Sequence, residues 1–136
     1  MKLLALDTSS EACSVAISSK GKIFESHFIE AKSHTRVLLP AIMAMLDVAK
    51  LNMDEIDAVV LGIGPGSFVG MRIGASVAQG LAFASNIKII PISSMETIAL
   101  EVMLIHSLSE IVVMQNARMN EVYVGEYKIC ADGLTE

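Results

Sequence analysis

The first residues whose types and spacing could do chemistry lie in the segment LDTSSEACSVAI at positions 6–17, where Thr8 and Ser9 directly follow Asp7. A carboxylate at the end of a strand, with hydroxyl groups in the turn after it, suits water-mediated contacts to magnesium and phosphate. The same residues suit an Asx turn, in which the aspartate accepts hydrogen bonds from the following backbone amides. Spacing alone leaves both interpretations open.

A second candidate is the segment GIGPGSFVGMRIG at positions 62–74, which holds five of the nine glycines. It lies between a predicted buried strand and a predicted helix, whose first amides could receive an anion. It matches neither a Walker loop nor a dinucleotide fingerprint, because no GK[ST] follows and Ser67 occupies the third glycine position. The segment is either a phosphate loop or a tight turn whose glycines allow close packing. The candidate nucleotide-binding residues of the two segments are Asp7, Thr8, Ser9, Gly64, Gly66 and Ser67.

The remaining reactive side chains predict no catalytic or metal site. His27, His34 and His106 are not spaced as helical metal ligands, and His34 is interpreted as a solvated or capping residue near a helix start. Cys13 and Cys130 form no CxxC pair and are predicted to be reduced. There is no GxSxG elbow, so no catalytic residue is predicted.

The elements that must position these groups follow from hydrophobic periodicity and turn signals. The pattern predicts strands over 2–7, 12–18, 20–30, 57–64 and 87–93, helices over 33–52, 67–85 and 93–104, and two further strands within 110–129 that turn near 118–120. Ser33 and Ser93 are the predicted N-caps of the first and third helices. The first strand, a continuous apolar run, is expected to be buried on both faces.

This order predicts an α/β fold, a mixed five-stranded sheet with helices on its faces. It is the order of the ribonuclease H-like lobe that actin, hexokinase and the Hsp70 ATPase domain each use twice. We expect residues 1–108 to form this N-terminal actin-like lobe and residues 109–136 to begin a second, incomplete lobe.

Composition limits the possible partners. The net charge of −5 argues against broad nucleic-acid binding by this chain alone, so any RNA is expected to bind only where a partner supplies a cationic surface. The apolar run at the N-terminus is too short for a secretory signal, and no run approaches the length that spans a bilayer, which predicts no membrane association and a cytoplasmic location.

Two predicted helices, 33–52 and 67–85, are apolar around most of their circumference, and the mean hydropathy of the chain is +0.58. Either the two helices bury each other on one side of the sheet, or a partner chain also covers them. The predicted interface residues are Leu38, Leu39, Ile42, Met45, Met71, Ala75, Ala78 and Gln79.

Four segments together resemble the TsaB family, also called YeaZ. They are LLALDTSSEACSVAI, SHTRVLLPAI, GPGSFVGMRIG and NARMNEVYVGEY. The chain departs from the family pattern at Val69, where threonine is usual, at Asn116, where aspartate is common, and at Asn120, where glycine is common. A typical member is also considerably longer.

The resemblance implies a non-catalytic scaffold subunit of the complex that makes N6-threonylcarbamoyladenosine at position 37 of tRNAs that read codons beginning with A. It implies a heterodimer with the paralogue TsaD, recruitment of the ATPase TsaE, and a homodimer when the chain is alone. TsaD-type enzymes hold a metal through an HxxxH pair, which this sequence lacks. No certain cofactor is implied; ATP or ADP with magnesium would be shared in the complex, and the nucleotide loops would be vestigial. The alternative is an actin-like ATPase or a glycoprotease-like enzyme acting alone.

Overall fold

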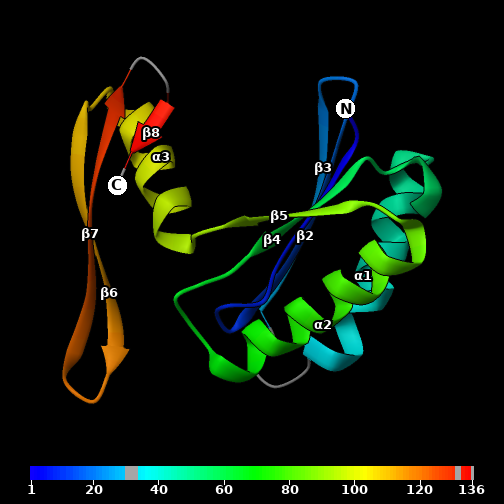
Figure 1. Cartoon of the computed structure of the whole chain (residues 1–136), viewed down its shortest axis with the longest axis horizontal. Helices are drawn as coiled ribbons and strands as arrows, with labels where there is room; N and C mark the ends of the chain where they lie inside the picture. Colours follow the sequence, from blue (N-terminus) through cyan, green and yellow to red (C-terminus); the bar gives the residue numbers. More distant parts are fainter. Residues whose placement is uncertain (30–33, 131–132, 136) are drawn as a thin grey trace.

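The computed structural model describes residues 1–29, 34–130 and 133–135. These residues form a five-stranded and a three-stranded sheet that stand beside each other, with helices packed against them (Figure 1). The elements are β1 (Leu3–Asp7), β2 (Ala12–Ser19), β3 (Lys22–Ile29), α1 (His34–Ala49), the short 3-10 helix η1 (Met53–Glu55), β4 (Ala58–Gly62), α2 (Phe68–Ser85), β5 (Lys88–Ile92), α3 (Ser94–His106), β6 (Glu110–Arg118), β7 (Glu121–Cys130) and β8 (Gly133–Thr135).

The five-stranded sheet has the strand order β3-β2-β1-β4-β5. β1 to β3 form an antiparallel meander, whereas β1 pairs in parallel with β4 and β4 in parallel with β5. The parallel pairs arise because α1 and α2 carry the chain back across the sheet before each new strand begins. The predicted mixed sheet of an actin-type lobe is therefore confirmed.

Helices α1 and α2 both cover one face of this sheet (Figure 1). Alternate residues of β1 point toward them, so that Leu4 and Leu6 are 0% and 2% exposed. Leu3 and Ala5, on the other face, are only half-buried. The expectation that the first strand is buried on both faces was therefore wrong, because no helix of the described chain covers its second face as α1 and α2 cover the first.

The third helix belongs to a second hydrophobic core. α3 packs on β6 and β7 of the three-stranded sheet, whose order is β6-β7-β8. This small core consists of Met95, Ala99, Met103, Val113 and Tyr127. The predicted division at residue 108 remains a prediction, but the structure places α3, which that division assigned to the first lobe, against the second sheet.

The turn predicted near 118–120 is present. Arg118, Met119 and Asn120 join β6 to β7, and all three have positive φ angles, between 52° and 65°. Ser93 caps α3 by accepting a hydrogen bond from the Glu96 amide, whereas Ser33 lies outside the described residues. Within the described ranges, no helix is long and apolar enough to pass through a membrane.

Candidate functional site

The β1–β2 turn and the glycine-rich segment, far apart in the sequence, lie against each other. The Ser67 amide donates a hydrogen bond to the Ser9 carbonyl over 2.5 Å, and the Thr8 hydroxyl donates to the Gly70 carbonyl over 2.7 Å. Thr8 and Ser9 are 1% and 7% exposed. Both contacts tie the start of α2 to the end of β1, so the two segments form one closely packed corner of the sheet.

Two glycines of α2 and its approach loop make this corner possible. A Cβ atom added to Gly66 would collide with the carbonyl of Ser9, and one added to Gly70 would collide with the carbonyl of Thr8. Only glycine allows the two backbones to approach so closely. These contacts support the interpretation of the segment as a tight turn that packs closely, which was one of the two alternatives.

Asp7 forms the Asx turn that the sequence allowed. Its Oδ1 accepts a hydrogen bond from the Ser9 amide over 2.6 Å, and its Oδ2 accepts one from the Ser94 hydroxyl over 3.3 Å. The Ser94 amide also donates to the carbonyl of Gly64, over 2.8 Å. The first residue of α3 therefore links the β1–β2 turn to the glycine-rich segment.

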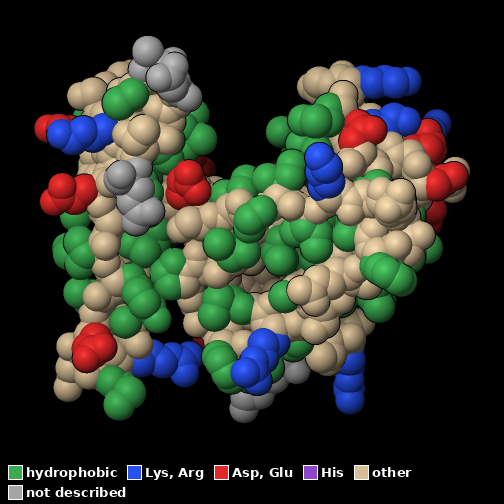
Figure 2. Space-filling view, viewed as in Figure 1, with side chains coloured by type: hydrophobic (Ala, Val, Ile, Leu, Met, Phe, Trp, Pro, Cys, Tyr) green, Lys and Arg blue, Asp and Glu red, His purple; other side chains and the backbone are tan. Residues whose placement is uncertain are grey.

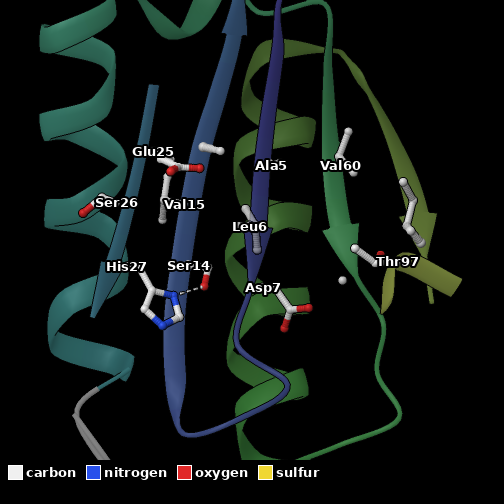
Figure 3. A pocket seen from close by; sticks show the side chains of 13 residues that line it. Ala5, Leu6, Asp7, Ser14, Val15, Glu25, Ser26, His27, Val60 and Thr97 are labelled. Atoms are coloured by element: carbon white, nitrogen blue, oxygen red, sulfur yellow. Dashed lines mark hydrogen bonds between the residues drawn. The ribbon is translucent and has the colours of Figure 1, made fainter. Parts of the chain in front are cut away.

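The face of the five-stranded sheet opposite α1 and α2 contains a cavity of about 620 Å³. Asp7, Ser14 and His27 lie in one row across β1, β2 and β3, and their side chains point into it (Figure 3). The Ser14 hydroxyl lies 2.8 Å from His27 Nδ1. The described lining also includes Glu25 but no lysine or arginine, so this cavity disfavours phosphate groups.

A second cavity, of about 640 Å³, lies between the β1–β2 turn, the first residues of α1 and α2, and the β6–β7 turn. The β6–β7 turn repeats the geometry at Asp7, because Asn116 Oδ1 accepts a hydrogen bond from the Arg118 amide over 2.7 Å. Figure 2 shows that the surface of the molecule is hollowed between its two units. Ser9 of the first turn and Asn116 and Arg118 of the second thus line one cavity.

The predicted nucleotide-binding residues are brought together, but they do not form one binding surface. Asp7 lines the first cavity, Ser9, Gly66 and Ser67 line the second, and Thr8 and Gly64 line neither. The residues also fit a magnesium nucleotide poorly. Both oxygens of Asp7 already accept hydrogen bonds, and the Ser67 amide is used by Ser9. No group of three or more potential metal ligands occurs in the part of the chain that is described.

The predicted interface residues divide between core and surface. Leu38, Ile42 and Ala78 are at most 1% exposed and pack in the core of this chain, so they cannot contact a partner. The reason is helical phase: the stripe through Leu38 and Ile42 faces the sheet, and the adjacent stripe faces solvent. Of the other predicted residues, Leu39 and Gln79 are exposed, and Met45, Met71 and Ala75 are half-buried.

The exposed faces of α1 and α2 carry large apolar side chains that the interface prediction did not include. Met43 is 60% exposed on α1, while Phe68 and Phe83 are 64% and 91% exposed on α2. The two helices are neighbours on the same side of the sheet (Figure 1). Together with Leu39, these residues define what we call the α1–α2 face.

Three polar residues of the site could not be found from the sequence. Ser94 and Gln115 contact the β1–β2 turn and the glycine-rich segment only because the chain folds back, and no local pattern marks them. His34 was interpreted as a solvated or capping residue, but it is only 7% exposed, and its Nε2 donates to the Ser10 carbonyl over 3.0 Å.

Comparisons with known proteins point to tRNA modification. The model of the TsaD family, described as tRNA N6-adenosine threonylcarbamoyltransferase, matches residues 28–136. Two curated proteins named tRNA threonylcarbamoyladenosine biosynthesis protein TsaB, from Haemophilus influenzae and Escherichia coli, are 42% and 36% identical to 93% and 98% of this chain. The chain spans only 53% and 58% of their lengths. The solved structure of YeaZ from Pseudomonas aeruginosa superposes with a TM-score of 0.91 at 36% identity, over 98% of this chain and 63% of that one.

Proposed function

Because this chain belongs to the TsaD family of tRNA N6-adenosine threonylcarbamoyltransferases, we propose that it is a non-catalytic scaffold subunit in the synthesis of N6-threonylcarbamoyladenosine at position 37 of tRNA. Its similarity to proteins named TsaB supports this role in the pathway. In this proposal the chain pairs with a TsaD paralogue in the cytoplasm and helps to recruit TsaE, and tRNA is bound only by the complex. Both this pairing and a homodimer of the chain alone would use the α1–α2 face.

The observation that carries the scaffold role is the α1–α2 face. Leu39, Met43, Phe68 and Phe83 are between 48% and 91% exposed, although their helices already cover the sheet with their other sides. Large apolar side chains gathered on one side of a small protein are typical of a protein–protein interface. The small side chains of α2 between its two phenylalanines, such as Ser76 and Gly80, would let a partner helix approach closely.

We further propose that ATP or ADP with magnesium is held jointly by the complex and not by this chain alone. The polar groups that could contact a nucleotide, those of Asp7, Thr8 and Ser67, are already hydrogen-bonded within the corner. Their role here is to position the β1–β2 turn. A partner or TsaE would therefore have to supply the free donors and the metal ligands.

The scaffold proposal is tested by co-purification with TsaD and by measurement of the modified nucleoside in a strain that lacks the natural protein. We expect Leu39→Glu to abolish both, because it places a charge in a dry interface. Val112→Glu is the matched control, since Val112 is 54% exposed on the far sheet and its replacement should preserve both. Unchanged co-purification of the Leu39→Glu protein would contradict the proposal. Turnover of ATP or a peptide by the isolated chain would favour the alternative of an enzyme acting alone.

A further inference from the structure

Two residues that line the second cavity each bury a polar side-chain atom in its wall. His34 and Gln115 both line it, and neither His34 Nδ1 nor Gln115 Oε1 has a hydrogen-bond partner among the described residues. His34 is more than nine-tenths buried. Buried polar groups in native proteins are nearly always satisfied, so each orphan atom calls for a group that the described residues do not provide.

The existing hydrogen bonds identify both atoms as acceptors. His34 Nε2 contacts the carbonyl of Ser10, which can only accept, so Nε2 carries the hydrogen, and in this tautomer of the imidazole Nδ1 is an acceptor. Gln115 Nε2 donates to the carbonyl of Pro65 over 3.0 Å, which leaves Oε1 as the acceptor. The carboxylate of Glu11 also lines the cavity. This part of the wall therefore requires N–H donors.

Another part of the wall attracts negative charge. Ser67 caps the N-terminus of the 18-residue helix α2 at the cavity, and this end of the helix dipole is positive. The side chain of Arg118 lines the same cavity from the β6–β7 turn. A simple anion would satisfy the N-terminus of α2 and Arg118 but not the two orphan acceptors. A simple cation would satisfy the acceptors but not the positive groups.

We propose that this cavity binds a small zwitterion of the amino-acid type. Its carboxylate would face the start of α2 and Arg118, and its ammonium group would donate to His34, Gln115 and Glu11. The volume of about 640 Å³ is ample for such a molecule. The orphan atoms are covered by neighbouring wall atoms in this structure, so binding must draw the two side chains toward the ligand.

The proposal is tested by calorimetric titration of the whole chain with matched probes. L-serine and L-alanine carry both charges, acetate and inorganic phosphate only the negative one, and ethylammonium only the positive one. We expect saturable binding of both amino acids, with affinity at least about tenfold higher than for any single-charge probe, because the latter lose charge-assisted hydrogen bonds. Absence of saturable binding would mean that the cavity holds only water, and it would overturn the proposal. Equal binding of phosphate would do so as well.

Variants assign the binding to this cavity. Arg118→Gln, in the exposed turn, and Gln115→Leu should each weaken amino-acid binding about tenfold or more. Arg36→Gln removes an exposed arginine that does not line the cavity and should leave the affinity unchanged. Equal effects of the two arginine variants would overturn the assignment. If Gln115→Leu unfolds the chain, as judged by circular dichroism, the comparison of Arg118→Gln with Arg36→Gln still tests whether the amino acid binds in this cavity. Co-purification with TsaD is measured in parallel, because the scaffold role can fail or hold independently of this binding.

Discussion

Two glycines of α2 show how far the cost of one methyl group depends on its surroundings. An added Cβ at Gly70 would strike the Thr8 carbonyl, whereas at Gly80 it would meet nothing within 4 Å. We expect Gly70→Ala to lower the free energy of unfolding by at least about 2 kcal/mol, since neither backbone can yield without opening the corner. Gly80→Ala, the control in the same helix, should raise it by about 0.5–1 kcal/mol because alanine favours helix.

Urea denaturation of the three proteins measures both effects on one scale. If Gly70→Ala proved as stable as the unmodified chain, the close packing of α2 on the β1–β2 turn would not hold the fold together. The functional interpretation of the glycine-rich segment would then regain weight over the packing interpretation.

The two cysteines also differ in their surroundings. Burial raises the pKa of the Cys13 thiol, and Cys13 is 1% exposed in the core, whereas Cys130 is exposed. Because the thiolate is the reactive form, we expect Cys130 to react with a thiol reagent within minutes at pH 8 and Cys13 to react only in denaturant. A chromogenic disulfide titration measures this, and the Cys130→Ser protein should show no fast phase. A fast phase in that variant would show that β2 is accessible.

At the level of residues, the sequence could predict types of contact but not their partners. An Asx turn at Asp7 was one of two interpretations that the sequence allowed, because that hydrogen bond reaches only two residues along the chain. The contact of Asp7 with Ser94 joins residues that become neighbours only when α3 docks, and no local pattern encodes it. Long-range polar contacts of this kind depend on the finished packing.

Among the elements, α1 carries residues that stabilise the fold on one side and residues of the proposed interface on the other. Leu38 is 1% exposed and Leu39 is 48% exposed, although they are adjacent in the chain. We expect Leu38→Ala to cost about 3 kcal/mol of unfolding free energy, and Leu39→Ala to change it by less than about 0.5 kcal/mol. Thermal or urea unfolding measures the difference. Equal costs would mean that α1 is rotated from its position in this structure. Ala78 on α2 is also fully buried, so a charged side chain at this position would destabilise the fold and would not test pairing.

Elements were predicted well wherever local periodicity decides them. The strands and helices of the first sheet follow alternation and caps that a single chain segment carries, as in β2 with its alternating burial. The face that each element covers is a different matter. α3 exposes apolar side chains such as Leu104 and Ile105 besides those it buries, so its sequence does not determine which of the two sheets it covers. The sheet that α3 covers depends on which of the two cores buries its apolar side chains better.

For the molecule as a whole, the two hydrophobic cores are expected to open separately. The first core is formed by β1, β2, β4, α1 and α2, and the second by α3 and the three-stranded sheet. We expect Met103→Ala, which leaves a cavity in the second core, to accelerate amide hydrogen exchange in β6 and β7 while β1 and β4 stay protected. Exchange followed by mass spectrometry measures this. A uniform increase across both sheets would show that the chain unfolds as one unit.

The paired turns, Asp7–Ser9 at one sheet and Asn116–Arg118 at the other, have one last consequence. Because the same type of turn occurs twice in one polypeptide, each turn serves as an internal control for the other at the same temperature, pH and concentration. The two turns differ in one respect, since a carboxylate accepts the hydrogen bond in the first and a side-chain amide oxygen accepts it in the second. Exchanging the two side chains, Asp7→Asn and Asn116→Asp, would show how far each turn depends on the charge of its acceptor.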